Sequence, residues 1–279
     1  MAAPTFAITN DLNWSVSHRP LFYQRANGST AEWPDRVAVV RDDTERCLGS
    51  VSSDYETLQN ADLLKLVNPL VEEGLLTISN MGYLNHGARV FAQAKLNQEY
   101  KVIGEDYKGY VTLLNGHVGN CSVAIGSTMT RVICGNTFTS AYSDISEKYR
   151  HSAGVTGRVL ESSYVINYVN GAMSTYAKYM ETLAGARCTG SQFKEFIGQV
   201  YGKDTDKMRD SFVDQLNNLF YNGAGNEGKT MHDAFAAVTE YASNYSRKST
   251  SGRFLYSQFG QGARINNRAL RAGLELAAV

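Results

Sequence analysis

Cys134 is the residue whose neighbours come closest to forming a catalytic site. Asn136 lies two positions further along the chain, and His86, His117 and His151 stand in the same half of the sequence. A thiol with a histidine base can act as a nucleophile. Because nothing in the spacing requires that arrangement, two interpretations stay open. One is a thiol enzyme centred on Cys134, and the other is a buried cysteine at the end of an apolar strand, where Cys134 and Asn136 close the sheet.

The sequence gives little support for a metal site or a nucleotide-binding site. His117 and Cys121 are four residues apart, but they fall in a predicted loop, and a zinc site would need two more ligands. The glycine cluster at 223–225 lies between two predicted helices rather than after a strand, which is the wrong context for a phosphate loop. We therefore predict no catalytic residue, no metal and no cofactor.

A basic and aromatic group in the centre of the chain points to phosphates and bases instead. Tyr149 and His151 alternate there with basic residues. Four cations stand against two acidic residues, a local excess of two, and these cations are Arg131, Lys148, Arg150 and Arg158. Cations hold phosphates and rings stack on bases, so this mixture is typical of a nucleic-acid groove.

A second basic group lies near the C-terminus. Six cations stand there against Glu275 alone, namely Arg247, Lys248, Arg253, Arg264, Arg268 and Arg271. Arg264, Arg268 and Arg271 are spaced by four and three residues, which places them on one ridge of a helix. The alternative for each arginine is a solvated or ion-paired side chain. The clustering favours nucleic-acid binding by both groups.

Composition limits the other function classes. The chain has 279 residues with 27 basic and 27 acidic side chains, so a nucleic-acid site has to be a local patch. Its four cysteines form no C-x-x-C pair, which indicates reduced thiols in a cytoplasm. No apolar run approaches the ~18 residues of a membrane span, and the start lacks the pattern of a signal peptide. We expect a soluble protein without a membrane partner.

The first half of the chain is predicted to be rich in antiparallel strands. After about thirty turn-rich residues, 36–41 and 47–51 form a hairpin, and further strands are expected at 75–79, 89–95, 110–114, 122–125 and 132–133. Asn60 is expected to cap a helix that ends at Gly74. Short links between the strands favour antiparallel pairing.

The second half is predicted to be helical. An apolar stripe with alternating spacings of four and three residues indicates an amphipathic helix from about 155 to 186, packed inside the chain or against another subunit. Shorter helices follow, one capped by Ser191 and one by a Thr230–Asp233 capping box, with a loop at 222–228. We predict an α+β fold in one intertwined domain over 1–279, with β-rich residues 1–135 and helical residues 155–279.

Five ordered segments resemble the phage and plasmid protein family known as domain of unknown function 932. They are 86–92 (HGARVFA), 131–137 (RVICGNT), 149–152 (YRHS), 237–241 (AVTEY) and 259–263 (FGQGA). The chain departs from the family pattern after Tyr241, where an Asp-His pair is usual, and at Gly135, where relatives often carry asparagine. The resemblance implies a mobile-element context. Strands followed by a long helix are also similar to the single-strand annealing proteins of the RecT and Red-beta kind.

Together these observations predict a protein of a phage or plasmid, in the cytoplasm of the bacterial host, that binds and anneals single-stranded DNA. It would need no ATP, would make no covalent bond and would act as a homo-oligomer, a ring or a filament. The predicted binding residues are Arg131, Lys148, Tyr149, Arg150, His151, Arg158, Arg264, Arg268 and Arg271. The competing hypotheses are a counter-defence effector that binds a host protein through its tyrosines, and the thiol enzyme.

Overall fold

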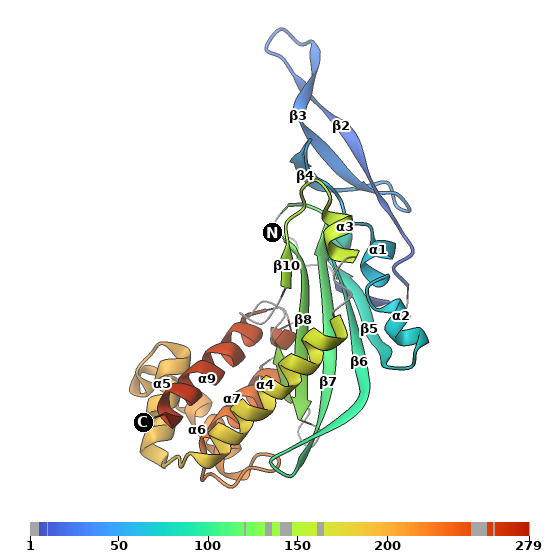
Figure 1. The fold of residues 1–279 in the computed structure, drawn as a ribbon. Helices are drawn as coiled ribbons and strands as arrows, with labels where there is room; N and C mark the ends of the chain where they lie inside the picture. Colours follow the sequence, from blue (N-terminus) through green and yellow to red (C-terminus); the bar gives the residue numbers. More distant parts are fainter. Residues whose placement is uncertain are drawn as a thin grey trace. The chain divides into compact units, whose positions relative to one another are not determined.

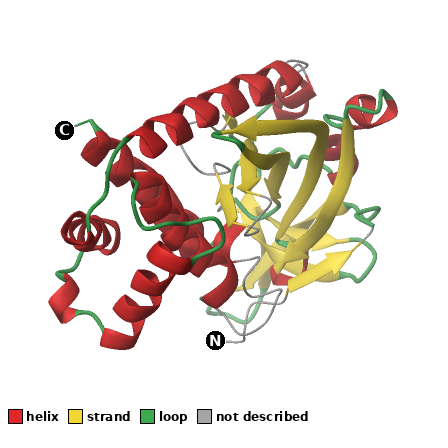
Figure 2. Ribbon diagram, turned by 90° about the horizontal axis from the view of Figure 1, so that it is seen from below, coloured by secondary structure: helices red, strands yellow, loops and turns green. Residues whose placement is uncertain are grey.

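The structure is a computed structural model that describes residues 6–9, 11–119, 121–131, 136–139, 147–160, 165–246, 256–258 and 260–278. It confirms the predicted α+β class, with antiparallel strands in the first half and helices in the second (Figure 1 and Figure 2). The chain forms two compact units. Unit 1 comprises 1–97, 111–125 and 147–167, and unit 2 comprises 98–110, 126–146 and 168–279. The single domain expected from the sequence stays a prediction.

The larger sheet has the strand order β1-β5-β6-β7-β8-β10, and β9 also pairs with β8. Its strands are β1 (Phe6–Thr9), β5 (Leu76–Leu84), β6 (Arg89–Val102), β7 (Glu105–Gly116), β8 (Val123–Arg131), β9 (Asn136–Thr139) and β10 (Glu147–Tyr149). Four predicted strands are thus confirmed at greater length, and the expected strand at 132–133 lies outside the described residues. Ile103 and Gly104 have φ angles of 50° and 81°, the backbone of a two-residue hairpin turn, which joins β6 to β7 and was not predicted.

The smaller sheet has the order β2-β3-β4, with β2 (Val16–Gln24), β3 (Thr30–Arg41) and β4 (Arg46–Ser52). The predicted hairpin is confirmed, since Arg36 lies opposite Ser52 and Arg41 opposite Arg46. The turn-rich start is wrong for most of its length, because β2 occupies it, whereas the turn expected at 27–29 is confirmed between β2 and β3. β3 passes through Pro34, which it tolerates because the β2–β3 register shifts at this point and no ladder bond is needed there.

The single helix predicted between Asn60 and Gly74 is wrong. Two short helices replace it, α1 (Asn60–Leu64) and α2 (Asn68–Glu72). Pro69 lies in the first turn of α2, where a helix tolerates proline, whereas one continuous helix would hold it in the interior. Asn60 does not cap α1, because Gln59 occupies the N-cap position.

The long helix predicted over 155–186 is described as α3 (Val155–Leu160) and α4 (Val165–Gly185), and 161–164 lie outside the described residues. Its apolar stripe is confirmed on α4, where four side chains are buried: Met173, Tyr176, Met180 and Leu183. Because they are buried within one chain, this part of the stripe packs inside the protein. A subunit contact through these four residues is excluded.

Unit 2 also contains α5 (Gly190–Tyr201), η2 (Thr205–Lys207), α6 (Asp210–Asn222), α7 (Met231–Glu240), the π-helix η3 (Tyr241–Tyr245) and α9 (Gln261–Ala277). Every residue of α7 is buried, and α7 packs against α6 and α9. The capping box of Thr230 and Asp233 is confirmed. The cap predicted at Ser191 is wrong, because Thr189 caps α5 in a capping box with Gln192.

Candidate nucleic-acid interface

The structure distributes the predicted binding residues over both units. Unit 1 holds five of them, on β10, in the turn that follows and on α3: Lys148, Tyr149, Arg150, His151 and Arg158. Unit 2 holds four, at the end of β8 and on α9: Arg131, Arg264, Arg268 and Arg271. Each unit therefore carries its own group of cations.

Arg158 is bound to the loop that precedes α3. Its Nη1 donates to the carbonyl of Ala153 at 2.8 Å, and its Nη2 donates to the carbonyl of Arg150 at 3.1 Å. Nη2 also donates to the carbonyl and the hydroxyl of Ser152, at 3.3 and 3.0 Å. The guanidinium thus fixes the loop backbone, and both terminal nitrogens are engaged.

His151 is likewise used within unit 1. Its ring stacks on Tyr55 with centroids 4.7 Å apart, and its Nδ1 donates to the carbonyl of Glu56 at 3.1 Å. Burial lowers the pKa of His151, while carbonyl contacts with Glu56 and Cys121 act in the opposite direction. Tyr149 is half-buried and its backbone pairs with Val123. Among the five residues of unit 1, Lys148, Arg150 and Arg158 are exposed.

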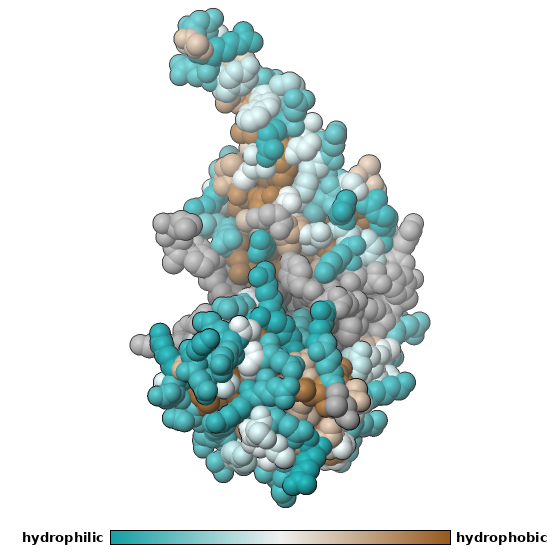
Figure 3. All heavy atoms as spheres, turned by 90° about the vertical axis from the view of Figure 1, so that its left-hand side faces the viewer, coloured by the Kyte–Doolittle hydropathy of each residue, from teal (hydrophilic) through white to brown (hydrophobic). Residues whose placement is uncertain are grey.

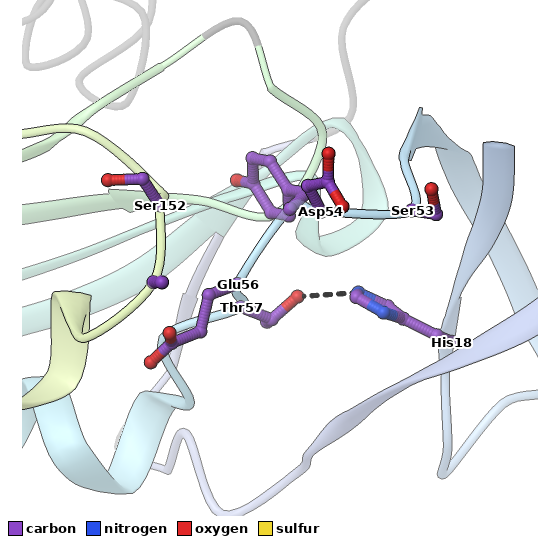
Figure 4. A pocket seen from close by; sticks show the side chains of 8 residues that line it. His18, Ser53, Asp54, Glu56, Thr57 and Ser152 are labelled. Atoms are coloured by element: carbon purple, nitrogen blue, oxygen red, sulfur yellow. Dashed lines mark hydrogen bonds between the residues drawn. The ribbon is translucent and has the colours of Figure 1, made fainter. Parts of the chain in front are cut away.

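A pocket of about 670 Å³ adjoins this loop in unit 1 (Figure 4). It is lined by His18, Ser53, Asp54, Tyr55, Glu56, Thr57, Ser152 and Ala153. His18 Nε2 is hydrogen-bonded to the Thr57 hydroxyl at 2.9 Å, and Glu56 Oε2 accepts from the Gly154 amide at 2.6 Å. The carboxylates of Asp54 and Glu56 disfavour phosphate there. This pocket does not form the phosphate groove expected from the sequence.

The cationic ridge predicted for the C-terminal helix is confirmed on α9. Arg264, Arg268 and Arg271 are all exposed, whereas Ile265 and Ala269 on the opposite side are buried. The spacing of four and three residues places the three guanidinium groups on one face. Figure 3, which faces the side on which α5 and α9 lie, shows a mainly hydrophilic surface over unit 2.

Arg268 also lines a pocket of about 530 Å³ in unit 2, which we call the cation pocket. α5, η2, α6, η3 and α9 contribute to it, together with the turns beside η2. Its lining comprises four cations, three aromatic residues and two others: Lys203, Lys207, Arg209 and Arg268, Tyr201, Phe212 and Tyr241, and Met208 and Gln261. Among the residues that the structure describes, no carboxylate lines it, so the pocket attracts anions, and its volume is that of a small-ligand site.

The aromatic wall of the cation pocket is held by ring contacts. Tyr201 and Phe212 meet edge to face with centroids 5.0 Å apart, and Phe212 meets Tyr241 in the same way at 5.1 Å. Burial raises the pKa of Tyr201. The nearby Tyr256 and Tyr241 raise this pKa further, and Arg268 lowers it. The Tyr201 hydroxyl therefore stays neutral. Tyr241 begins the π-helix, a rare element that is frequent at functional sites.

The sequence analysis missed most of the cation pocket for a definite reason. Asp204, Asp206 and Asp210 alternate along the chain with its three cations near η2, so the sequence shows no local excess of charge. In the fold these carboxylates do not line the pocket. Asp204, for example, caps η2 by accepting from the Asp206 amide. Only the arginines of α9 gave a signal in the sequence.

Residues 223–230 also carry a pattern that the sequence analysis overlooked. They read GAGNEGKT, which fits the phosphate-loop pattern GxxxxGK[ST]. The structural context differs, because helix α6 and not a strand precedes this loop. Asp233 Oδ2 accepts from the amides of Lys229 and Thr230 at 3.0 and 2.9 Å, and from the Thr230 hydroxyl at 3.0 Å. A carboxylate of the chain thus occupies the donors that would hold a phosphate.

The described residues give little support to metal or thiol chemistry. None of them form a group of three or more His, Cys, Asp or Glu side chains able to hold a metal ion. His117 is fully buried, and burial lowers its pKa to about 3. Burial and Asp233 raise the pKa of the Cys188 thiol to about 11. Cys134 lies outside the described residues, so the thiol-enzyme hypothesis stays untested.

The family model described as a domain of unknown function, DUF932, matches residues 47–271. No curated protein and no solved structure matches the chain significantly. The expected likeness to single-strand annealing proteins therefore stays a prediction. Within the described part of the chain, no helix is long and apolar enough to cross a membrane.

Proposed function

The chain belongs to the DUF932 family, whose name assigns no activity, and we propose that it binds single-stranded DNA and anneals complementary strands. The observation that carries this proposal is the cation pocket. Four cations from two segments of unit 2 converge on one cavity, which no carboxylate of the described residues lines, and Arg264 and Arg271 extend the same charge along α9. Such a surface neutralises a phosphate backbone.

Single strands fit this surface better than a compact anion does. Phe212 and Tyr241 are partly exposed beside the cations, so a base next to a bound phosphate can meet a ring. Lys148 and Arg150 give unit 1 further exposed cations of the predicted set. Binding by backbone charge and stacking is tolerant of sequence, as strand annealing requires.

Annealing itself needs no covalent chemistry. Two strands whose phosphates are neutralised and whose base edges are exposed pair faster than free strands, because their repulsion is reduced and they are held close together. We propose that several subunits along a strand supply this environment, in the cytoplasm of a bacterium that carries the phage or plasmid. The buried residues of α4 are not the contact between these subunits.

The pocket is tested by fluorescence anisotropy of a labelled oligonucleotide at a series of salt concentrations. Each phosphate contact adds about 0.7 to the slope of log K against log salt for single strands. The double variant Lys207→Ala/Arg268→Ala should therefore bind more weakly, with a slope lower by about 1.4. Lys178→Ala, an exposed cation of α4 outside the pocket, is the matched control. Equal slopes for the double variant and the wild type would contradict the proposal.

A further inference from the structure

The distal part of the β2–β3 hairpin, residues 19–36, exposes an unusual number of rings, and we call it the hairpin arm. Phe22, Tyr23 and Trp33 are 62%, 48% and 48% exposed. The exposed fraction of Phe22 is notable because phenylalanine has no polar group that water can hydrate. Figure 1 shows β2 and β3 extending beyond β4 as a two-stranded ribbon. Three large rings thus stand on a thin element of unit 1.

The arm has no hydrophobic core of its own to explain these rings. The core of the small sheet lies at its base, where Val16, Val39 and Val51 are buried. Along 22–30 every side chain is exposed. A two-stranded ribbon without a covered face gains little from burying apolar surface. The rings of the arm are therefore available to a partner.

The backbone of the arm does not favour strand addition by that partner. Pro20 in β2 and Pro34 in β3 have no amide hydrogen to donate, and the β2–β3 register shifts between Pro20 and Phe22. Prolines and bulges of this kind protect an exposed edge from pairing with another strand. A partner would therefore contact the faces of the ribbon, where the side chains lie.

Both faces of the ribbon carry a ring. Phe22 lies opposite Glu32, and its neighbour Tyr23 lies opposite Ala31. Since successive residues of a strand point to opposite faces, Trp33 shares the face of Ala31 and Tyr23. The guanidinium of Arg36 lies 5.9 Å from the centroid of the Trp33 ring. Arg36 Nη2 also donates to the carbonyl and the hydroxyl of Ser50, at 2.8 and 2.9 Å, which fixes it beside that ring.

The charge of β2 selects the class of partner. β2 and the turn after it, residues 16–29, contain Arg19, Arg25 and His18 but no carboxylate. The acidic residues of the arm, Glu32 and Asp35, both lie on β3. Arg19 on β2 and Arg25 directly after it therefore flank Phe22 and Tyr23. Cations that alternate with exposed rings match an unpaired nucleic-acid strand, whose phosphates and bases alternate in the same way.

We propose that the hairpin arm is a second contact for single-stranded DNA, in which bases stack on Tyr23, Trp33 and Phe22 while Arg19 and Arg25 hold phosphates. The inference rests on the proposed function, because it names a further surface for the same ligand. A duplex keeps its bases stacked on each other and cannot offer them to these rings. The arm therefore makes the protein prefer single strands to duplexes.

Intrinsic fluorescence reports on this stacking directly. The protein has two tryptophans. Trp14 is partly buried and packs against Arg41, whose guanidinium lies 4.1 Å from the ring centroid, and against Tyr83, so it is less accessible than Trp33. Titration with unlabelled oligothymidylate should quench Trp33. Trp33→Phe should remove the quenching and keep most of the affinity, because phenylalanine still offers a ring.

Affinity is measured with an arm variant and a matched control. Phe22→Ser/Tyr23→Ser/Trp33→Ser should bind oligothymidylate about five- to 150-fold more weakly for each base that loses its ring. An abasic strand of equal length should bind to this variant and to the wild type alike, because it has phosphates without bases. Leu75→Ser changes another exposed apolar residue of unit 1 and should leave both affinities unchanged. Equal melting temperatures show that the arm variant is folded.

The outcomes separate this inference from the proposed function. If the wild type binds oligothymidylate and the arm variant binds it equally well, the arm inference is wrong and the proposed function stands. If the wild type binds no strand even at low salt, the proposed function is wrong. If the arm variant changes the mass of the assembly in mass photometry but not the affinity for oligothymidylate per protomer, the arm contacts protein, which also overturns the inference.

Discussion

The rings of Tyr55 and His151 stack with centroids 4.7 Å apart and an interplanar angle of 20°. Tyr55 in turn donates from its hydroxyl to the carbonyl of Gly116 at 2.7 Å. A histidine placed between basic residues in the sequence is therefore part of the internal packing of unit 1. The same pattern of residue types can build a nucleic-acid groove or fasten a loop, and here hydrogen bonds and ring contacts show the second use.

Arg158→Ala should destabilise unit 1. The substitution removes four hydrogen bonds to the loop before α3, most of them to backbone carbonyls. Because these bonds lie at the surface, we expect the free energy of unfolding in urea to fall by about 1–2 kcal/mol. Arg158→Lys keeps the charge but not the forked donors, and its free energy of unfolding should fall by nearly as much. An alanine variant as stable as the wild type would refute this role.

Stability should decline as the solution becomes acidic, because His117 is buried. Its Nε2 donates to Asn60 Oδ1 at 3.0 Å, and its pKa is lowered from 6.5 to about 3, mainly by burial. Below pH 6.5 the unfolded chain binds a proton at His117 that the folded chain does not. Above pH 6.5 the neutral His117 therefore leaves the free energy of unfolding at its full value. Below pH 6.5 this free energy falls by about 1.4 kcal/mol per pH unit.

Urea unfolding at pH 7 and pH 5 measures this loss, which amounts to about 2 kcal/mol for one such histidine. Burial also lowers the pKa of His151, so this residue adds to the loss with the same sign. His117→Gln should be less stable than the wild type at pH 7 but should show a smaller difference between the two pH values. An unchanged pH dependence in that variant would assign the effect to other groups.

Two phenylalanines give a matched test of which rings support the fold. Phe193 is fully buried on α5 and stacks on Phe220 with centroids 4.2 Å apart, whereas Phe22 is largely exposed on the hairpin arm. Phe193→Ala should lower the free energy of unfolding by about 3–5 kcal/mol, because it leaves a cavity. Phe22→Ala should change it by less than about 0.5 kcal/mol. If thermal melting shows that both variants lose a similar amount of stability, the ring of Phe22 is packed in solution.

ATP should not bind at the loop 223–230 despite its sequence pattern. Asp233 already occupies the amides of Lys229 and Thr230, and an added phosphate would lie beside its negative charge. ATP with magnesium should therefore leave the melting temperature unchanged, in the wild type and in Asp233→Asn alike. A rise in melting temperature that is lost in Lys229→Ala would contradict this reading and revive a nucleotide site.

The sequence predicts the features of this fold that depend on local patterns. Strand alternation, the stripe of α4, the capping box of Thr230 and the ridge of Arg264, Arg268 and Arg271 are all set by residues close together in the chain. The sequence analysis failed where distant segments decide the outcome. The cation pocket combines 201–212 with Tyr241 and Arg268, and the role of Arg158 depends on the carbonyls that the loop brings to it.

The prediction for the start of the chain failed for a related reason. The segments 27–29 and 33–35, which contain Gly28 and Pro34, are turn signals when each is taken alone, and they predict a turn-rich region before the first strand. In the structure Gly28, with φ of 83°, forms the hairpin turn, and the prolines lie at irregular places of β2 and β3. The exposed rings of the arm could be recognised as a binding surface only after the ribbon was known.

The central claim is that this protein binds single-stranded DNA through backbone charge. Fluorescence anisotropy of the wild type with one labelled oligonucleotide, at about 50 and 200 mM salt, tests it most directly. We predict saturable binding at the lower concentration, weakened at least tenfold at the higher one. Absence of binding at the lower concentration, together with a stoichiometric complex with one host protein, would contradict the claim and favour a protein-binding effector.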